Sequence, residues 1–240
     1  MAVVLAGCAK TGVTPTQVTW APGRPAPSKV LVYHFAVTPG QVRENQSIIQ
    51  RAVRSGSSTT PQKRNAQIGH QVSDRMTVHL VAGITALGLP AEVAALDRDA
   101  EIGEMQIVGQ FLRVDEGNRL KRTVIGFGAG GSKVDVVTQV YYVTDRGARK
   151  MLEFRTHADS GKMPGAAVTM GAGAAAQGGV TAGVAAANVA TGSIKAYKSE
   201  VDRMAAKSAD EAVKYLGEFF QKQGWIRPGQ VKSRGMMKDR

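Results

Sequence analysis

The side chains best suited to ligate a metal ion or to act as a nucleophile are one cysteine and four histidines. These residues are Cys8, His34, His70, His79 and His157. Metal-binding helices place two ligands on one face, about four residues apart, but His70 and His79 are nine residues apart. The acids Asp115 and Glu116 precede Gly117 at a predicted turn and have no nucleophile beside them in the sequence. We therefore predict that the protein is not an enzyme and holds no metal ion.

The run from Gly126 to Gly131 has the GxGxxG spacing of dinucleotide-binding loops. Such a loop works when a strand leads into it and a helix follows, because the helix N-terminus then faces the pyrophosphate. Residues 134–143, which follow, alternate as a strand does. We therefore interpret the glycines as a turn between two strands, and we predict no bound cofactor.

The cysteine ends the run Leu5-Ala6-Gly7-Cys8, which resembles the lipobox of bacterial lipoproteins. In that family a signal peptidase cuts before the cysteine, and the cysteine sulfur carries a diacylglycerol. The two small residues before Cys8 fit such a cut, and a lone cysteine has no disulfide partner within the chain. The resemblance implies a covalent lipid on Cys8, with residues 1–7 as the remnant of a signal peptide. Because no basic residue and no full apolar segment come first, we expect the true start to lie upstream of Met1.

Residues 8–28 are rich in Thr, Pro, Gly and Ala, and we predict an extended tether there between the lipid and a folded domain. In lipoproteins an Asp directly after the cysteine retains the protein at the inner membrane. Ala9 stands at that place, which favours the outer membrane with the domain facing the periplasm.

The chain of 240 residues is strongly basic, with a formal net charge of +12, and 43% of its residues are hydrophobic. This hydrophobic content is enough for one packed domain, which we place at residues 29–226. An excess of basic residues favours binding to nucleic acid, anionic lipid or another polyanion. Since an exported protein does not meet nucleic acid, we expect an envelope protein or an envelope polyanion as partner. Residues 227–240 form a basic tail.

Apolar periodicity predicts an α+β fold, in which two main helices pack on a mixed or antiparallel sheet. Strands are predicted at 29–37, 105–114, 134–143 and 149–156, and helices at 65–87 and 194–223. The first strand is apolar at nearly every position, which is typical of a strand in the middle of a sheet. The turn Asp145-Arg146-Gly147 predicts a tight hairpin between the third and fourth strands.

A Gly/Ala-rich insert, residues 163–194, precedes the last helix and contains no charged residue. Its glycines include a GxxxG pair, a spacing that lets two helices approach closely in a bilayer. The candidate self-association or membrane residues are Gly171, Gly173, Gly178, Gly179 and Gly183. Two interpretations stay open: a loop or small-residue hairpin, and a segment that inserts into a membrane or associates with other copies.

Several motifs resemble a family of uncharacterised bacterial lipoproteins, catalogued as domain of unknown function 4410. They are Val108-Gly109-Gln110-Phe111, Asp115-Glu116-Gly117-Asn118, Ile125-Gly126-Phe127-Gly128-Ala129-Gly130 and the strand at 134–143. The order of elements is also distantly similar to the periplasmic domain of the curli-secretion lipoprotein, a ring-forming outer-membrane channel.

These observations lead to two main hypotheses, and a third, a cytosolic enzyme or nucleotide binder, applies only if the lipobox resemblance is false. The first is a non-enzymatic, lipid-anchored protein with a binding or scaffolding role at the outer membrane. The second is a subunit of an oligomeric outer-membrane assembly or secretion channel, in which the Gly/Ala-rich insert associates or inserts. The first rests on Cys8 and on the basic balance, and the second on residues 163–194 and the curli-channel likeness.

Overall fold

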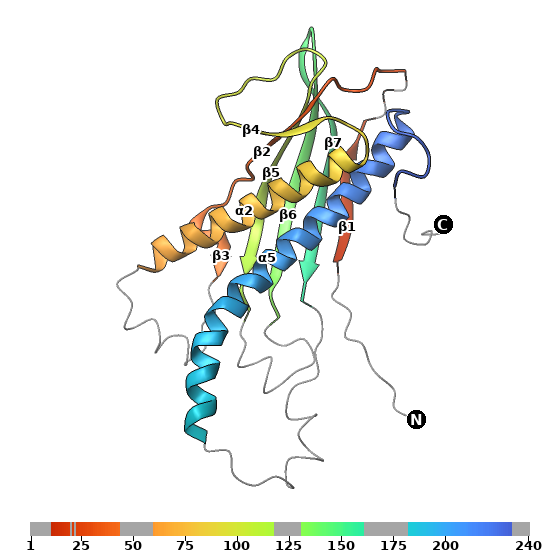
Figure 1. Ribbon diagram of the computed structural model, residues 1–240. Coiled ribbons are helices and arrows are strands. Elements are labelled where there is room, and N and C mark those ends of the chain that lie inside the picture. Colours follow the sequence, from red (N-terminus) through yellow and green to blue (C-terminus); the bar gives the residue numbers. More distant parts are fainter. Residues whose placement is uncertain are drawn as a thin grey trace, which may run out of the picture.

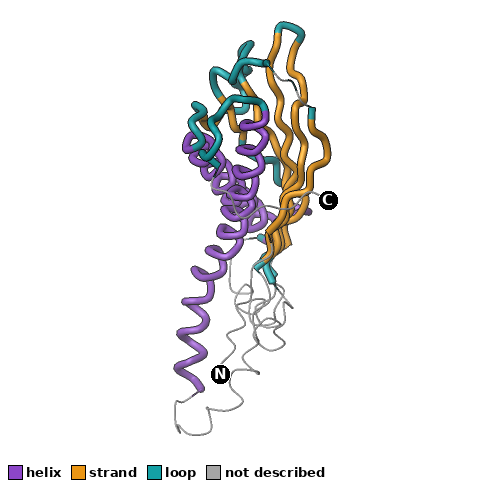
Figure 2. The backbone as a smooth tube through the Cα atoms, turned by 90° about the vertical axis from the view of Figure 1, so that its right-hand side faces the viewer, coloured by secondary structure: helices purple, strands orange, loops and turns teal. Residues whose placement is uncertain are grey.

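The computed structural model describes residues 11–19, 21, 23–43, 60–117, 131–160 and 182–231, with the backbone alone for residues 39 and 182–200. Helices pack on one face of a seven-stranded sheet, as Figures 1 and 2 show, which confirms the predicted α+β fold. The elements are β1 (Thr11–Val18), β2 (Val30–Tyr33), η1 (Pro39–Gln41), β3 (Val42–Arg43), α2 (Pro61–Ala86), β4 (Ala91–Ala94), β5 (Met105–Asp115), β6 (Lys133–Thr144), β7 (Gly147–Asp159) and α5 (Ala182–Lys222).

The sheet has the strand order β1-β7-β6-β5-β2-β4, and β3 adds to β5 off this path. Strands β1, β7, β6 and β5 are antiparallel neighbours, whereas β2 runs parallel to both β5 and β4. The sheet is therefore mixed. All four residues of β2 are buried, which confirms that this strand lies inside the sheet. The predicted hairpin is also confirmed, because Thr144 pairs with Gly147 across a two-residue turn.

Helix α2 begins four residues earlier than predicted, at Pro61 rather than at residue 65. The Thr60 hydroxyl accepts a hydrogen bond from the Lys63 backbone N–H at 3.3 Å, and Pro61 occupies the first helical position. The predicted apolar stripe of this helix is buried against the sheet, as is that of α5. The buried members on α2 are Val72, Met76, Leu80 and Ile84, and those on α5 are Val201, Met204, Ala205, Ala212, Leu216 and Phe220. The core therefore lies between the helical layer and one sheet face.

The predicted tether, residues 8–28, is not an extended spacer throughout, because part of it forms a strand of the sheet. Residues 11–18 form the edge strand β1, which pairs antiparallel with β7 from Thr11 opposite Ala158 to Val18 opposite Leu152. Farther along, the Trp225 indole N–H donates to the Arg24 carbonyl at 2.9 Å. Both segments thus belong to the domain. An edge strand tolerates the proline at position 15, although proline has no backbone N–H to donate, because one side of an edge strand has no neighbouring strand to bond.

The last helix is longer than predicted, since α5 begins at Ala182 rather than at residue 194. Its first turns run past the end of the sheet in Figure 1, whereas the rest crosses the sheet beside α2. Alanine-rich sequence favours a helix even without an apolar stripe. None of the helices in the described part of the chain is long and apolar enough to cross a bilayer.

Candidate functional site

Most of the residues that the sequence singled out for membrane attachment lie outside the described part of the chain. These are Cys8 together with Gly171, Gly173, Gly178 and Gly179. Gly183 lies in the second position of α5, where the structure gives the backbone only. The GxGxxG run ends at Gly131, and the strand β6 follows it from Lys133, as predicted.

The four histidines are not brought together by the fold. His34 lies 3.2 Å from Asp74, His79 lies 3.7 Å from Asp210, and His70 is exposed on α2. Among contacts between described residues, His157 is the one histidine that lies within 4 Å of two acids. Across the described residues, no group of three or more histidine, cysteine or acidic side chains is arranged to hold a metal ion.

The sheet face turned away from the helices is a polar surface, which we call the open face. Figure 2 shows this side of the strands with no helix over it. The open face arises from strand alternation, because every second residue of β5, β6 and β7 points away from the core. Its members are Gln106, Val108, Gln110, Arg113, Asp115, Lys133, Asp135, Val137, Gln139, Tyr141, Lys150, Glu153, Arg155, His157 and Asp159.

A hydrogen-bonded chain crosses the middle of the open face. The Lys150 ammonium donates to Glu153 Oε2 at 2.9 Å, and the Gln139 amide donates to the same oxygen at 2.8 Å. The Tyr141 hydroxyl then donates to Gln139 Oε1 at 3.0 Å. The bond from Lys150, followed by that from Gln139, holds the pKa of Glu153 below its ordinary value. The same bond raises the pKa of Lys150.

A second cluster lies nearer the end of the sheet where β1 begins. His157 Nδ1 lies 2.5 Å from Asp135 Oδ1, and His157 Nε2 lies 3.4 Å from Asp159 Oδ2. On the neighbouring strand, Arg113 Nη2 donates to Asp115 Oδ2 at 2.7 Å. The Asp135 position faces Arg113 in the sheet register, so both pairs belong to one patch.

The charges of the open face balance each other. Its bases are Arg113, Lys133, Lys150 and Arg155, and its acids are Asp115, Asp135, Glu153 and Asp159. A chain of net charge +12 thus carries one broad face without net charge. Exposed pairs of this kind add little to stability. They present ordered donors and acceptors, which suits recognition of another polar surface.

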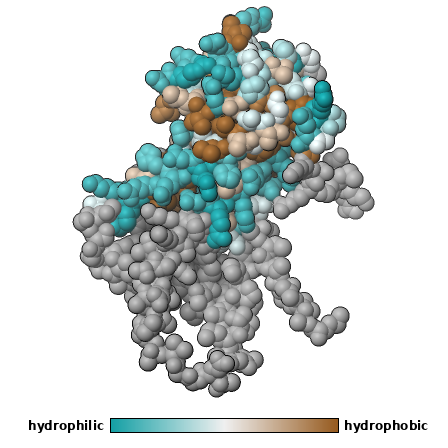
Figure 3. All heavy atoms as spheres, in the orientation of Figure 1, coloured by the Kyte–Doolittle hydropathy of each residue, from teal (hydrophilic) through white to brown (hydrophobic). Residues whose placement is uncertain are grey.

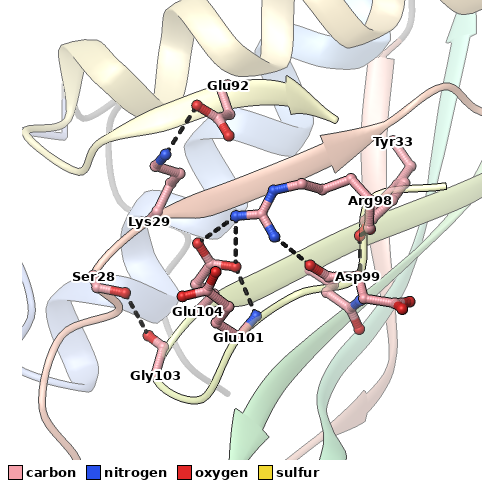
Figure 4. A network of polar contacts seen from close by, with 10 residues as sticks. Ser28, Lys29, Tyr33, Glu92, Arg98, Asp99, Glu101, Gly103 and Glu104 are labelled. Carbon is pink, nitrogen blue, oxygen red and sulfur yellow. Dashed lines mark hydrogen bonds and ion pairs between the residues drawn. The ribbon is translucent and has the colours of Figure 1, made fainter. Parts of the chain in front are cut away.

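At the other end of the sheet, the connection between β4 and β5 is held by a compact ion pair (Figure 4). Arg98 Nη2 donates to both carboxylate oxygens of Glu104, at 2.9 and 3.1 Å, and the Glu101 backbone N–H donates to Oε2 at 2.8 Å. Glu104 is only 5% exposed, so its charge is satisfied inside the protein. The Tyr33 hydroxyl also donates to the Arg98 carbonyl at 2.6 Å. These bonds fix the shape of residues 95–104.

Apolar side chains nevertheless stand out from this connection. Leu96 is 84% exposed, Ile102 is 70% exposed, and Val93 on the edge strand β4 is 43% exposed. On the helical side, Figure 3 shows hydrophobic residues gathered across the middle of the coloured surface, with hydrophilic residues above and below them. Single exposed apolar residues are common, but two of them on a loop that an ion pair holds in shape form a candidate contact surface for another protein.

Sequence reasoning did not find either surface. Alternation within β6 and β7 was visible, but the contact of Asp135 with His157 depends on an irregularity of register between Val140 and Tyr141. That irregularity has no clear sequence signal. The acidic and apolar composition of residues 92–104 is a sequence signal for the second of these surfaces.

Comparisons with known proteins identify a family and a loosely similar structure. The model of the family described as "Domain of unknown function (DUF4410)" matches residues 30–177. Among solved structures, two dodecamers of PelC from Paraburkholderia phytofirmans are similar, one of them a single-substitution variant, at 14% and 12% identity. Each similarity covers 85% of this chain and 97% of the PelC chain, with a TM-score of 0.34. A likeness this loose carries no argument about function. No curated protein matches the chain.

Proposed function

This chain belongs to the family described as "Domain of unknown function (DUF4410)", and from that premise we propose that it is a non-enzymatic, lipid-anchored binding or scaffolding protein of the bacterial envelope. The lipid is a diacylglycerol on Cys8, and the membrane is the outer membrane, because Ala9 follows the cysteine. The domain faces the periplasm. Its partner there is a protein or a polyanion of the envelope.

The observation that carries this proposal is the position of Cys8 relative to the fold. Only Ala9 and Lys10 separate the cysteine from Thr11, the first residue of β1. Thr11 pairs with Ala158 near the end of β7, far from the β6–β7 turn. A lipid on Cys8 would hold this end of the sheet close to the membrane. The open face would then be free for a partner, and its balanced charges favour a protein rather than a polyanion at that surface.

The test is fractionation of cells that carry the native gene with a C-terminal epitope tag. We expect the unchanged protein in the outer membrane, and Cys8→Ser in the soluble fraction. Ala9→Asp should move the protein to the inner membrane, and the matched control Ala9→Ser should leave it in the outer membrane. Outer-membrane recovery of Cys8→Ser equal to that of the unchanged protein would contradict the anchor.

A second candidate function is supported by the length of α5. The helix starts inside the Gly/Ala-rich insert and extends past the sheet, which is where contacts with other copies or with a membrane would form. In this alternative the chain is a subunit of an oligomeric assembly. Mass measurement by light scattering in detergent, with and without residues 163–194, tests it. An assembly larger than a dimer should be lost on deletion, and equal masses below that size in both samples would refute it.

A further inference from the structure

Two exposed segments of opposite charge lie side by side at the end of the sheet farthest from Thr11. The acidic loop is residues 95–104, and the basic hairpin is residues 144–149. Gly103 N–H donates to the Val143 carbonyl at 3.0 Å, and Val143 N–H donates to the Glu104 carbonyl at 2.9 Å. The base of the acidic loop therefore joins β6 just before the basic hairpin turns.

The acidic loop combines unpaired carboxylates with exposed apolar side chains. Asp97, Asp99 and Glu101 are exposed, and none has an ion pair within the described part of the chain. They flank Leu96 and Ile102, the two most exposed large apolar residues that the structure describes. Arg98, the single base of the loop, is already bound to Glu104. A negative, partly apolar surface thus stands out on a chain of net charge +12.

The basic hairpin has the opposite character. The hairpin carries two bases, Arg146 and Arg149, against one acid, Asp145, and all three are exposed. Neither guanidinium has an ion-pair partner among the described residues. The Thr144 hydroxyl accepts from the Arg146 backbone N–H at 3.2 Å and donates to the Gly147 carbonyl at 2.9 Å, so the turn is ordered. Both segments are held in shape before any contact forms, which reduces the entropy lost on binding.

We propose that these segments form a contact between two copies of this chain, in which the acidic loop of each copy meets the basic hairpin of the other. Adjacent segments of opposite net charge at one end of the sheet are self-complementary, and a two-fold axis between them pairs both at once. Leu96 and Ile102 lose exposure in the contact, while the charges set its orientation. This inference goes beyond the proposed function and does not depend on the lipid.

The contact is smaller than a standard protein interface, which engages about 20–30 residues on each side. We therefore expect a reversible dimer with a dissociation constant on the order of micromolar, weakened by salt. At about 1 M salt the screening length falls to about 3 Å, and the charge contribution should largely vanish.

Sedimentation equilibrium on the full chain with Cys8→Ser tests the proposal. Two charge-reversed forms are made: D97K/D99K/E101K in the acidic loop and R146E/R149E in the basic hairpin. We expect the parent to dimerise and each reversed form alone to stay monomeric, because like charges then meet. An equimolar mixture of the two forms should dimerise again, since each acidic segment finds a basic one.

Apolar variants give an independent arm of the test. Leu96→Ser and Ile102→Ser should each weaken the dimer about tenfold, whereas Val78→Ser, at a 54% exposed position on α2, serves as the matched control and should not. A parent that stays monomeric to about 1 mM, at the weak end of measurable affinity, would overturn the proposal. So would a dimer that survives both reversals, or a mixture that stays monomeric. Circular dichroism of each variant checks its folding. A negative result here leaves the fractionation result for Cys8 untouched.

Discussion

Substitution of Gly109 by alanine should destabilise the domain through a single, identifiable collision. A Cβ at this position would lie 2.1 Å from Cε1 and 2.3 Å from Cδ1 of the Phe35 ring. Carbon atoms in ordinary contact are about 3.5–4.0 Å apart, so the ring must move by more than 1 Å. The ring has little room to move, because Phe35 is only 3% exposed and packs edge-on against Phe111, with 6.2 Å between the two ring centroids.

The backbone around the ring is also fixed. Ala36 N–H donates to the Gly109 carbonyl, Phe111 N–H donates to the Ala36 carbonyl, and the Ser73 hydroxyl donates to the Phe35 carbonyl, each at 2.9 Å. Overpacking of a rigid site costs about 1–3 kcal/mol. Alanine in a strand regains about 0.5–1 kcal/mol relative to glycine. The net loss should be about 1–2 kcal/mol, a fall in Tm of about 2–8 °C for a domain of this size.

Thermal unfolding followed by circular dichroism measures this loss. Gly12→Ala is the matched control, since Gly12 also lies in a strand but has nothing within 4 Å of its Cβ position. It should leave the Tm unchanged or slightly raised. Phe35→Leu combined with Gly109→Ala should show a coupling that offsets part of the two separate losses. Equal Tm values for Gly109→Ala and Gly12→Ala would refute the reasoning.

Three further predictions concern buried and paired polar groups. The hydroxyl oxygens of Thr156 and Ser208 lie 2.5 Å apart in the core. Thr156→Val should therefore lower the free energy of unfolding, measured in urea, by about 1–3 kcal/mol, and adding Ser208→Ala should recover most of that loss. In an NMR titration, the pKa of Glu153 should lie below the ordinary glutamate value and rise in Lys150→Met; an unchanged midpoint would count against the ion pair. Because that pKa is lowered on folding, the stability from this pair is present above the unfolded pKa and is lost as the pH falls through the folded one. Burial, with a smaller effect of Glu218, raises the pKa of Tyr215, so its ultraviolet titration should occur at a higher pH than that of free tyrosine. The contribution of Tyr215 to stability should be lost as the pH rises through the folded pKa. Titration at the pH of free tyrosine would contradict its burial.

The parts of the fold that were predicted correctly depend on local patterns. The strands β5, β6 and β7 alternate along the chain, and the helix α2 carries an apolar stripe that ends before Gly88. Gly88 has a φ of +91°, which explains why glycine follows Leu87, the C-cap of that helix. Each of these signals lies within the element that it defines.

The parts that were missed depend on distant partners. Strand β1 reads as a spacer because it contains threonine, glycine and proline, and only its pairing with β7, far along the chain, makes it a strand. The first turns of α5, residues 182–193, come before the predicted start at residue 194 and are rich in alanine. Helix formation there follows from alanine propensity, which periodicity does not detect.

The open face was missed for a related reason. The two-residue turn between Thr144 and Gly147 sets the register as far as the pair Tyr141 and Lys150. From the next pair, Val140 and Leu152, the register is shifted by one residue. Without that shift Asp135 would face Thr156 instead of His157. The lipobox differs from the open face in that its signal is local in the sequence, at Cys8 and the residues before it. These residues lie outside the described part of the chain.

Mass spectrometry of the protein isolated from the membranes of its native host tests the central claim most directly. Trypsin cuts after Lys10, so the N-terminal peptide reports on the cysteine. The account predicts that this peptide is Cys8-Ala9-Lys10 bearing a diacylglycerol on the cysteine sulfur. An unmodified peptide that begins at or before Met1 and runs intact to Lys10 would contradict it.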